Sequence, residues 1–190
     1  MDHNVNIELS PELRAAIEDG SIDISKLKVG GAFGWEHIRN GEVIDSGYEG
    51  NIVTDEGLTY ILDVALSNGS ANATHYLGIY KNNYTPLSTD TASTFAGAGV
   101  ANEISTEVDE TTRPTWVEAG VATKSITNSA SPAAFTANAT VSAYGAFLIS
   151  NNTMGGLTGK LVAASKFTAV RNLVNTDVLN VTYTLTIADA

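Results

Sequence analysis

The stretch VLNVTYTLTI, residues 178–187, is the clearest indicator of the fold in this sequence. Apolar and polar side chains alternate strictly along it: Leu179, Val181, Tyr183, Leu185 and Ile187 alternate with Asn180, Thr182, Thr184 and Thr186. Successive side chains of a strand point to opposite faces, so this segment has one buried and one solvated face. That arrangement is typical of an antiparallel sheet.

Further segments upstream have the same character and are separated by turn-forming pairs. The strand candidates are residues 75–81, 115–119, 121–127, 133–137, 141–150 and 160–167. Residues 32–48 predict a β-hairpin, because Asn40-Gly41 is the preferred pair for a two-residue type I′ turn. Short strands at this spacing predict a mostly β protein with an antiparallel β-sandwich or jelly-roll-like body, or a barrel.

One helix is predicted at the entrance to this body, over about residues 54–67 in the stretch NIVTDEGLTYILDVALSNG. Thr54 is a good N-cap, the acidic pair after it suits the helix dipole, and Gly69 is placed to end the helix. The apolar side chains form one stripe at helical spacing: Leu58, Ile61, Leu62, Ala65 and Leu66. We expect this stripe to be buried over one end of the sandwich, so that a charge at Leu62 would be strongly destabilising.

The first part of the chain differs in composition, and we expect two units: an N-terminal arm, residues 1–30, and a β-sandwich domain, residues 31–190. The sequence SPELRAAIEDG predicts a short helix over about 11–19, with serine as N-cap and proline in the first turn. Its apolar face, Leu13 and Ile17 with one alanine, is too small to hold it in place alone. Two interpretations stay open: a loosely attached extension, or an arm in which Leu13 and Ile17 contact a neighbouring subunit.

Composition excludes several classes of function. The net charge is -11 with only ten Lys and Arg, which argues against binding to nucleic acid or to an anionic membrane surface. The chain contains no Cys, and therefore no disulfide, thiol nucleophile or Cys-based zinc site. No apolar run approaches the roughly 20 residues of a membrane helix. The first ten residues do not resemble a signal peptide, so we expect folding and assembly in the cytoplasm.

Few residues suggest chemistry. The three histidines, His3, His37 and His75, have no metal-ligand spacing, and no G-x-S-x-G elbow supports a nucleophilic serine. The acidic run NEISTEVDETTR carries Glu103, Glu107, Asp109 and Glu110. A carboxylate pair for glycan cleavage or a weak calcium site could be drawn from this run, but a solvated loop explains it better. We predict that the protein is not an enzyme and has no catalytic residue, metal or cofactor.

Aromatic residues offer a different kind of site, a platform for carbohydrate. Tyr84 and Trp116 lie beside polar loops and are the best candidates for exposed partner or ligand contacts. The other aromatics, Tyr48 among them, are expected in the core or in cross-strand pairs.

Several segments, read in order, resemble a family of small tailed-bacteriophage virion proteins commonly encoded among head-assembly genes. The resemblance covers about residues 51–187 and rests on NIVTDEGLTYILDVALSNG, HYLGIYKNNYTP, EVDETTRPTW, SITNSASPAAFT, YGAFLISNNTMGGLTGKLVAASKF and VLNVTYTLT. Its specificity comes from the succession, since no single segment is a mechanistic motif. The first thirty residues have no counterpart in it.

This resemblance implies a structural role: a capsid decoration or cement protein on the outer surface of the virion. It implies the major capsid protein as partner and carries over no catalytic residue. Repeated lateral contacts favour a homodimer or homotrimer. The alternative is a binding module at the neck, tail or fibre that recognises a host-surface carbohydrate.

Overall fold

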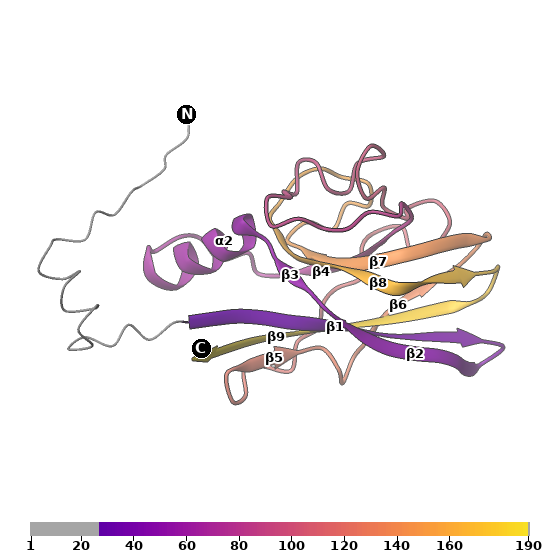
Figure 1. Cartoon of the computed structure of the whole chain (residues 1–190), viewed down its shortest axis with the longest axis horizontal. Coiled ribbons are helices and arrows are strands. Elements are labelled where there is room, and N and C mark those ends of the chain that lie inside the picture. The colour runs from indigo at the N-terminus through magenta and orange to yellow at the C-terminus, as the bar shows by residue number, and fades with distance from the viewer. Residues whose placement is uncertain (1–26, 190) are drawn as a thin grey trace, which may run out of the picture. The chain divides into compact units, whose positions relative to one another are not determined.

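The computed structural model describes residues 27–189 and confirms the predicted fold class (Figure 1). It is mostly β, with two antiparallel sheets that form a β-sandwich and, within the described residues, a single helix. Residues 29–187 form one compact unit. The predicted helix over 11–19, with Leu13 and Ile17, lies outside the described residues.

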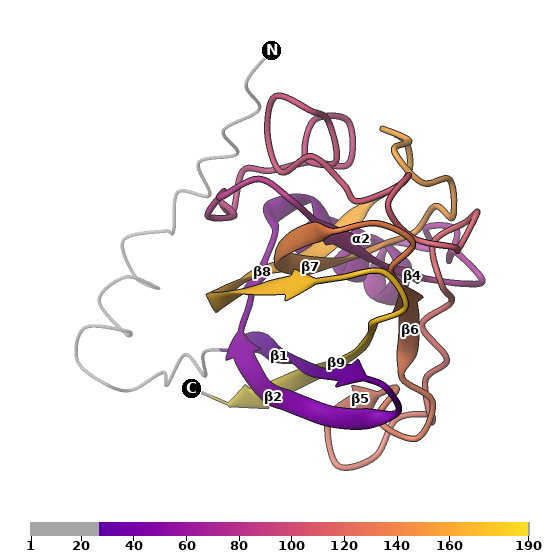
Figure 2. The same cartoon turned by 90° about the vertical axis from the view of Figure 1, so that its right-hand side faces the viewer.

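Sheet A has the strand order β2-β1-β9-β5, and β6 pairs with β9 beside β5. Its strands are β1 (Leu27–Arg39), β2 (Glu42–Gly50), β5 (Ser125–Thr127), β6 (Ala133–Thr136) and β9 (Val178–Asp189). Sheet B has the order β3-β8-β7-β4. Its strands are β3 (Ile52–Val53), β4 (Tyr76–Tyr80), β7 (Val141–Ile149) and β8 (Leu161–Leu173). Figure 2 shows the two sheets as stacked layers.

The main core lies between the sheets and follows the predicted alternation. In β9, Leu179, Val181 and Tyr183 are fully buried, while the intervening side chains are at least partly exposed. From β1, Phe33 enters the same core, and its ring lies 4.5 Å from that of Tyr183. The period-two pattern therefore identified the buried face correctly.

The predicted hairpin is present, with β1 and β2 joined by Asn40-Gly41. Both residues have positive φ, 53° and 81°, as a type I′ turn requires. Asparagine tolerates this left-handed conformation, and glycine has no Cβ to oppose it.

Two strand predictions need correction. Residues 115–119 form no strand; Thr115 makes only an isolated bridge with Tyr76. The strand expected over 121–127 is reduced to β5, because Thr123 and Lys124 have positive φ and make a turn. Both segments contain strand-forming residues, but such residues are compatible with an irregular backbone when no neighbouring strand pairs with them.

The loop after β4 builds a second apolar cluster. It covers the face of sheet B that points away from sheet A, above β7 and β8 in Figure 1. Phe95 is 1% exposed and packs edge-on against Tyr80 and Phe147. Sheet B is thus buried on both faces, which explains the nearly continuous burial along β7.

Helix α2 (Asp55–Leu66) begins as predicted. The Thr54 side chain accepts a hydrogen bond from the Gly57 backbone N–H at 3.0 Å and donates to the Leu161 carbonyl at 2.5 Å. Gly57 is required here, because a Cβ would lie 2.3 Å from the Val162 carbonyl oxygen. The N-cap therefore also attaches the helix to β8.

The buried side of α2 is the predicted one only in part. Ile61 of the predicted stripe lines an apolar pocket between the two sheets, together with Tyr60. Leu62 and Leu66 of the same stripe are 55% and 81% exposed, and for them the prediction is wrong. The helix does close one end of the sandwich, but the close approach at Gly57 sets its rotation and turns Leu62 to solvent.

The end of α2 also differs from expectation. Asn68, with φ 59°, takes the left-handed position expected of Gly69. The Gly69 N–H donates to the Asp63 carbonyl, which closes the last turn.

Candidate functional site

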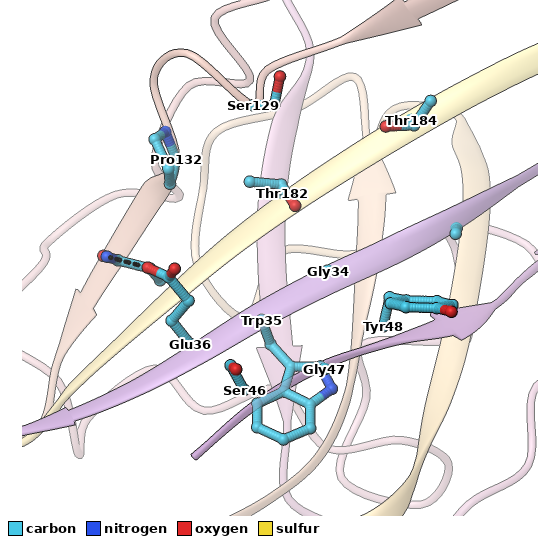
Figure 3. A pocket seen from close by; sticks show the side chains of 12 residues that line it. Gly34, Trp35, Glu36, Ser46, Gly47, Tyr48, Ser129, Pro132, Thr182 and Thr184 are labelled. Carbon is cyan, nitrogen blue, oxygen red and sulfur yellow. Dashed lines mark hydrogen bonds between the residues drawn. The ribbon is translucent and has the colours of Figure 1, made fainter. Parts of the chain in front are cut away.

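An open trough of about 840 Å³ lies on the outer face of sheet A, the face opposite the core (Figure 3). The alternation that buries Phe33 and Trp35 turns Gly34 and Glu36 outward. The lining residues are Ala32, Gly34, Trp35, Glu36, Ser46, Gly47, Tyr48, Ser129, Pro132, Asn180, Thr182 and Thr184. Three strands thus supply the floor, and the loop between β5 and β6 supplies one wall.

Asn128 holds that wall in place. It is fully buried, and its side-chain oxygen accepts a hydrogen bond of 2.7 Å from the Tyr183 backbone N–H. Its amide group donates to the carbonyls of Ser131 and Val181. The side chain therefore replaces strand pairing in the gap between β5 and β6, and it ties the loop that carries Ser129 and Pro132 to β9.

Tyr48 is the aromatic residue of the trough. It was expected in the core or a cross-strand pair, but it is 81% exposed. Its cross-strand neighbour is Gly34, which offers no side chain to cover the ring. A Cβ on Gly34 would lie 2.5 Å from the Thr182 hydroxyl oxygen, so this floor position must stay small. In Figure 3, Gly34 and Thr182 lie between Tyr48 on one side and Glu36 on the other.

The trough is polar and carries one carboxylate. Glu36 accepts a long hydrogen bond, 3.4 Å, from the Asn180 amide. Hydroxyl groups of Ser46, Ser129 and Thr182 complete the lining, and no Lys, Arg or His belongs to this set of described residues. The arrangement suits hydrogen bonding to a neutral polar ligand better than acid–base chemistry.

Tyr84, one of the two aromatics predicted to be exposed, is half-buried and committed to the loop. Its hydroxyl donates to the Asp90 carboxylate at 2.8 Å, and its ring packs edge-on against Phe95. Burial, together with this hydrogen bond to Asp90, raises the pKa of Tyr84 to about 12. The phenol thus serves to hold the loop on sheet B.

The prediction that Trp116 is exposed is wrong. The side chain is 8% exposed, and its indole N–H donates to the Tyr183 carbonyl at 3.2 Å. It lines the apolar pocket of about 140 Å³ into which Tyr60 and Ile61 of α2 project. His75 lies edge-on to Trp116, and burial lowers the pKa of this histidine despite the opposing charge of Glu118.

Glu103 of the acidic run forms a buried clamp with Arg113, the last residue of the same run. This guanidinium makes two 2.8 Å hydrogen bonds to the Glu103 carboxylate, and both side chains are at most 1% exposed. It also donates to the carbonyls of Asn151 and Gly156. The Gly155 N–H donates to Glu103 as well. Arg113 and Glu103 therefore join the loop after β4 to the turn between β7 and β8.

Two other carboxylates of the run are also engaged. Glu107 pairs with Lys81 at 2.5 Å, and Glu110 accepts from the Thr136 N–H. Burial acts to raise the pKa of Glu107, but hydrogen bonding and charge from Lys81 outweigh it and leave the pKa below its usual value. Across residues 27–189, no three His, Asp or Glu side chains converge as a metal site would require.

A second ionic cluster surrounds Asp177. His37 Nε2 lies 2.8 Å from its carboxylate, and Arg39 binds the same group with two nitrogen atoms. The Val174 N–H also donates to it. Hydrogen bonding from Arg39 is the main reason that the pKa of Asp177 lies well below its usual range. This cluster attaches the turn between β8 and β9 to β1.

Comparison of the sequence with models of protein families gave no match, and comparison with curated proteins gave none either. In the part of the chain that the structure describes, no helix has the length and apolar character needed to cross a membrane.

Proposed function

We propose that the chain is a non-enzymatic structural protein of a tailed-bacteriophage virion, a decoration or cement protein that binds the major capsid protein on the outside of the head. The proposal includes assembly in the host cytoplasm and association into a homodimer or homotrimer. It starts from the succession of segments that resemble small phage virion proteins.

The observation that carries the proposal is that carboxylates of the acidic run are bound to other groups of the protein. Its carboxylates were the best candidates for catalysis, yet Glu103 holds Arg113, Glu107 holds Lys81 and Glu110 holds a backbone N–H. A carboxylate committed to a buried bidentate pair is poorly placed to exchange protons with a substrate. These groups instead cross-link loops, as a rigid structural module requires.

The arrangement of the resembling segments gives further support. EVDETTRPTW supplies Arg113, which reaches Asn151 and Gly156 in YGAFLISNNTMGGLTGKLVAASKF. SITNSASPAAFT supplies Asn128, which completes the pairing of VLNVTYTLT. Segments that resemble the family in order thus depend on one another for their hydrogen bonds.

The test is the copy number of the chain in purified particles, measured by quantitative mass spectrometry against the major capsid protein. A ratio of one, or a simple fraction of it, is the result expected of a decoration protein. A handful of copies would move the protein to the neck, tail or fibre and would overturn the decoration role. Absence from purified particles would overturn the virion role altogether.

The alternative of a carbohydrate-binding module no longer has its original residues, because Trp116 is buried and Tyr84 is engaged with Asp90. If that activity exists, a different surface must supply it.

A further inference from the structure

We propose that the trough on the outer face of sheet A binds an uncharged polysaccharide, with one sugar ring stacked on Tyr48. This inference goes beyond the decoration role and does not depend on it, since it concerns binding by the isolated chain. It commits the trough to a glycan rather than to a peptide or a nucleic acid.

The aromatic platform is the first step of the argument. A ring that is 81% exposed on a paired strand is available to a ligand without rearrangement of the backbone. Tyrosine presents a flat apolar face and a polar hydroxyl, which together suit the apolar face and hydroxylated edge of a pyranose. Gly34 leaves the floor beside the ring open.

The polar groups are the second step. The 3.4 Å contact between Asn180 and Glu36 is too long to be strong, so both groups keep capacity for ligand hydroxyls. The carboxylate can accept hydrogen bonds from sugar hydroxyls, and the amide can donate hydrogen bonds to neighbouring ones. Ser46 and Thr182 add hydroxyl groups on the same face.

Rigidity and size are the third step. Asn128 fixes the loop that carries Ser129 and Pro132, so one wall is formed before a ligand arrives. The volume of about 840 Å³ lies within the range of roughly 300–1,000 Å³ for ligand sites and admits more than one sugar. A preformed site loses little conformational entropy on binding.

Charge decides the class of ligand. Glu36 is the sole ionisable carboxylate or basic side chain of the described lining, and the whole chain carries -11. An anionic glycan or a nucleic acid would meet repulsion without a compensating cation. An extended peptide is disfavoured because the trough lies across the face of the sheet, where backbone groups are already paired, and not along its edge.

The test uses the full purified chain on an array of bacterial O-antigen and capsular oligosaccharides, and isothermal titration calorimetry with the best neutral glycan found. Tyr48→Ala should weaken binding by about tenfold or more, whereas Tyr48→Phe keeps the ring and should stay within about threefold of the wild type. Glu36→Gln should also weaken binding. The affinity should change little with salt, because the ligand carries no charge.

The matched control is Leu66→Ala, since Leu66 is 81% exposed, as Tyr48 is, but lies on α2 outside the trough. It should leave binding unchanged, and thermal unfolding should be equal for all these variants. The proposal would be overturned if none of the neutral glycans tested bound with a dissociation constant below about 1 mM. Unaltered binding by Tyr48→Ala, or binding restricted to anionic glycans, would overturn it too. None of these results bears on the copy number, so this inference and the decoration role fail separately.

Discussion

Replacing Glu103 by Gln tests whether the Arg113 clamp holds the loops on sheet B. Both Glu103 oxygens accept hydrogen bonds: one from Arg113 Nε, the other from Arg113 Nη2 and the Gly155 N–H. An amide must place its NH₂ against one of these donors in either orientation. The substitution therefore leaves a buried cation uncompensated and a donor facing a donor.

The magnitude follows from burial. Breaking an ion pair whose side chains are 0% and 1% exposed should cost about 3–5 kcal/mol of unfolding free energy. At about 2–4 °C per kcal/mol for a chain of this length, the melting temperature should fall by about 6–20 °C. Circular dichroism during heating and urea titration measure both quantities.

Two further variants sharpen this test. Glu107→Gln removes a carboxylate from the same run, but its pair with Lys81 is about one quarter exposed, so the cost should stay below about 1 kcal/mol. Adding Arg113→Met to Glu103→Gln removes the stranded cation. The double variant should therefore cost at least about 1 kcal/mol less than the sum of the single changes. A loss below about 1 kcal/mol for Glu103→Gln, or strict additivity, would refute the reasoning.

Four other substitutions probe the remaining contacts. Leu62→Asp should alter the free energy of unfolding by less than about 0.5 kcal/mol, because Leu62 is exposed. Ile61→Asp should lower it by more than about 2 kcal/mol, because Ile61 lines the apolar pocket. Urea titration of both variants measures these changes. Thr54→Ala should cost about 1–2 kcal/mol in the same assay, since it removes the N-cap of α2. The pKa of Asp177 is lower in the folded than in the unfolded protein. Its contribution to the free energy of unfolding is therefore present above the unfolded-state pKa, near 4, and is lost as the pH falls toward the folded-state pKa. Melting temperatures from about pH 2 to 7 should therefore fall less steeply with acid in Asp177→Asn than in the wild type; an unchanged slope would contradict this.

The candidate site was harder to predict than the fold. Tyr48 belongs to a strand in which only Gly47 and Glu49 are partly buried and every other residue is exposed, so hydrophobic alternation could not place it. Trp116 was predicted to be exposed because its neighbours in sequence are polar. Its neighbours in space are different: Tyr183 and the apolar pocket beneath α2. A regular two-residue hairpin at Asn40-Gly41 would place Phe33 opposite Tyr48, but an irregularity between His37 and Ile38 shifts the register by one residue and places Gly34 there.

Local rules decided what the sequence could determine by itself. Alternation along β9, the turn at Asn40-Gly41 and the cap at Thr54 each depend on residues within a few positions of one another. Steric and hydrogen-bonding preferences at that range are the same in any context, so they predicted a mostly β protein with a capped helix over about residues 54–67.

Only the tertiary structure decided the rest. The rotation of α2 depends on the contact of Gly57 with Val162, the burial of the run depends on Glu103 meeting Arg113, and one wall of the trough depends on Asn128 reaching β9. Gly57 and Val162, like Asn128 and Tyr183, are brought within reach by pairing between strands far apart in the chain. Glu103 and Arg113 meet because the loop between β4 and β5 folds back on itself against the turn between β7 and β8. A side chain's exposure depends on all the groups that surround it, and those groups come together only when the two sheets have packed.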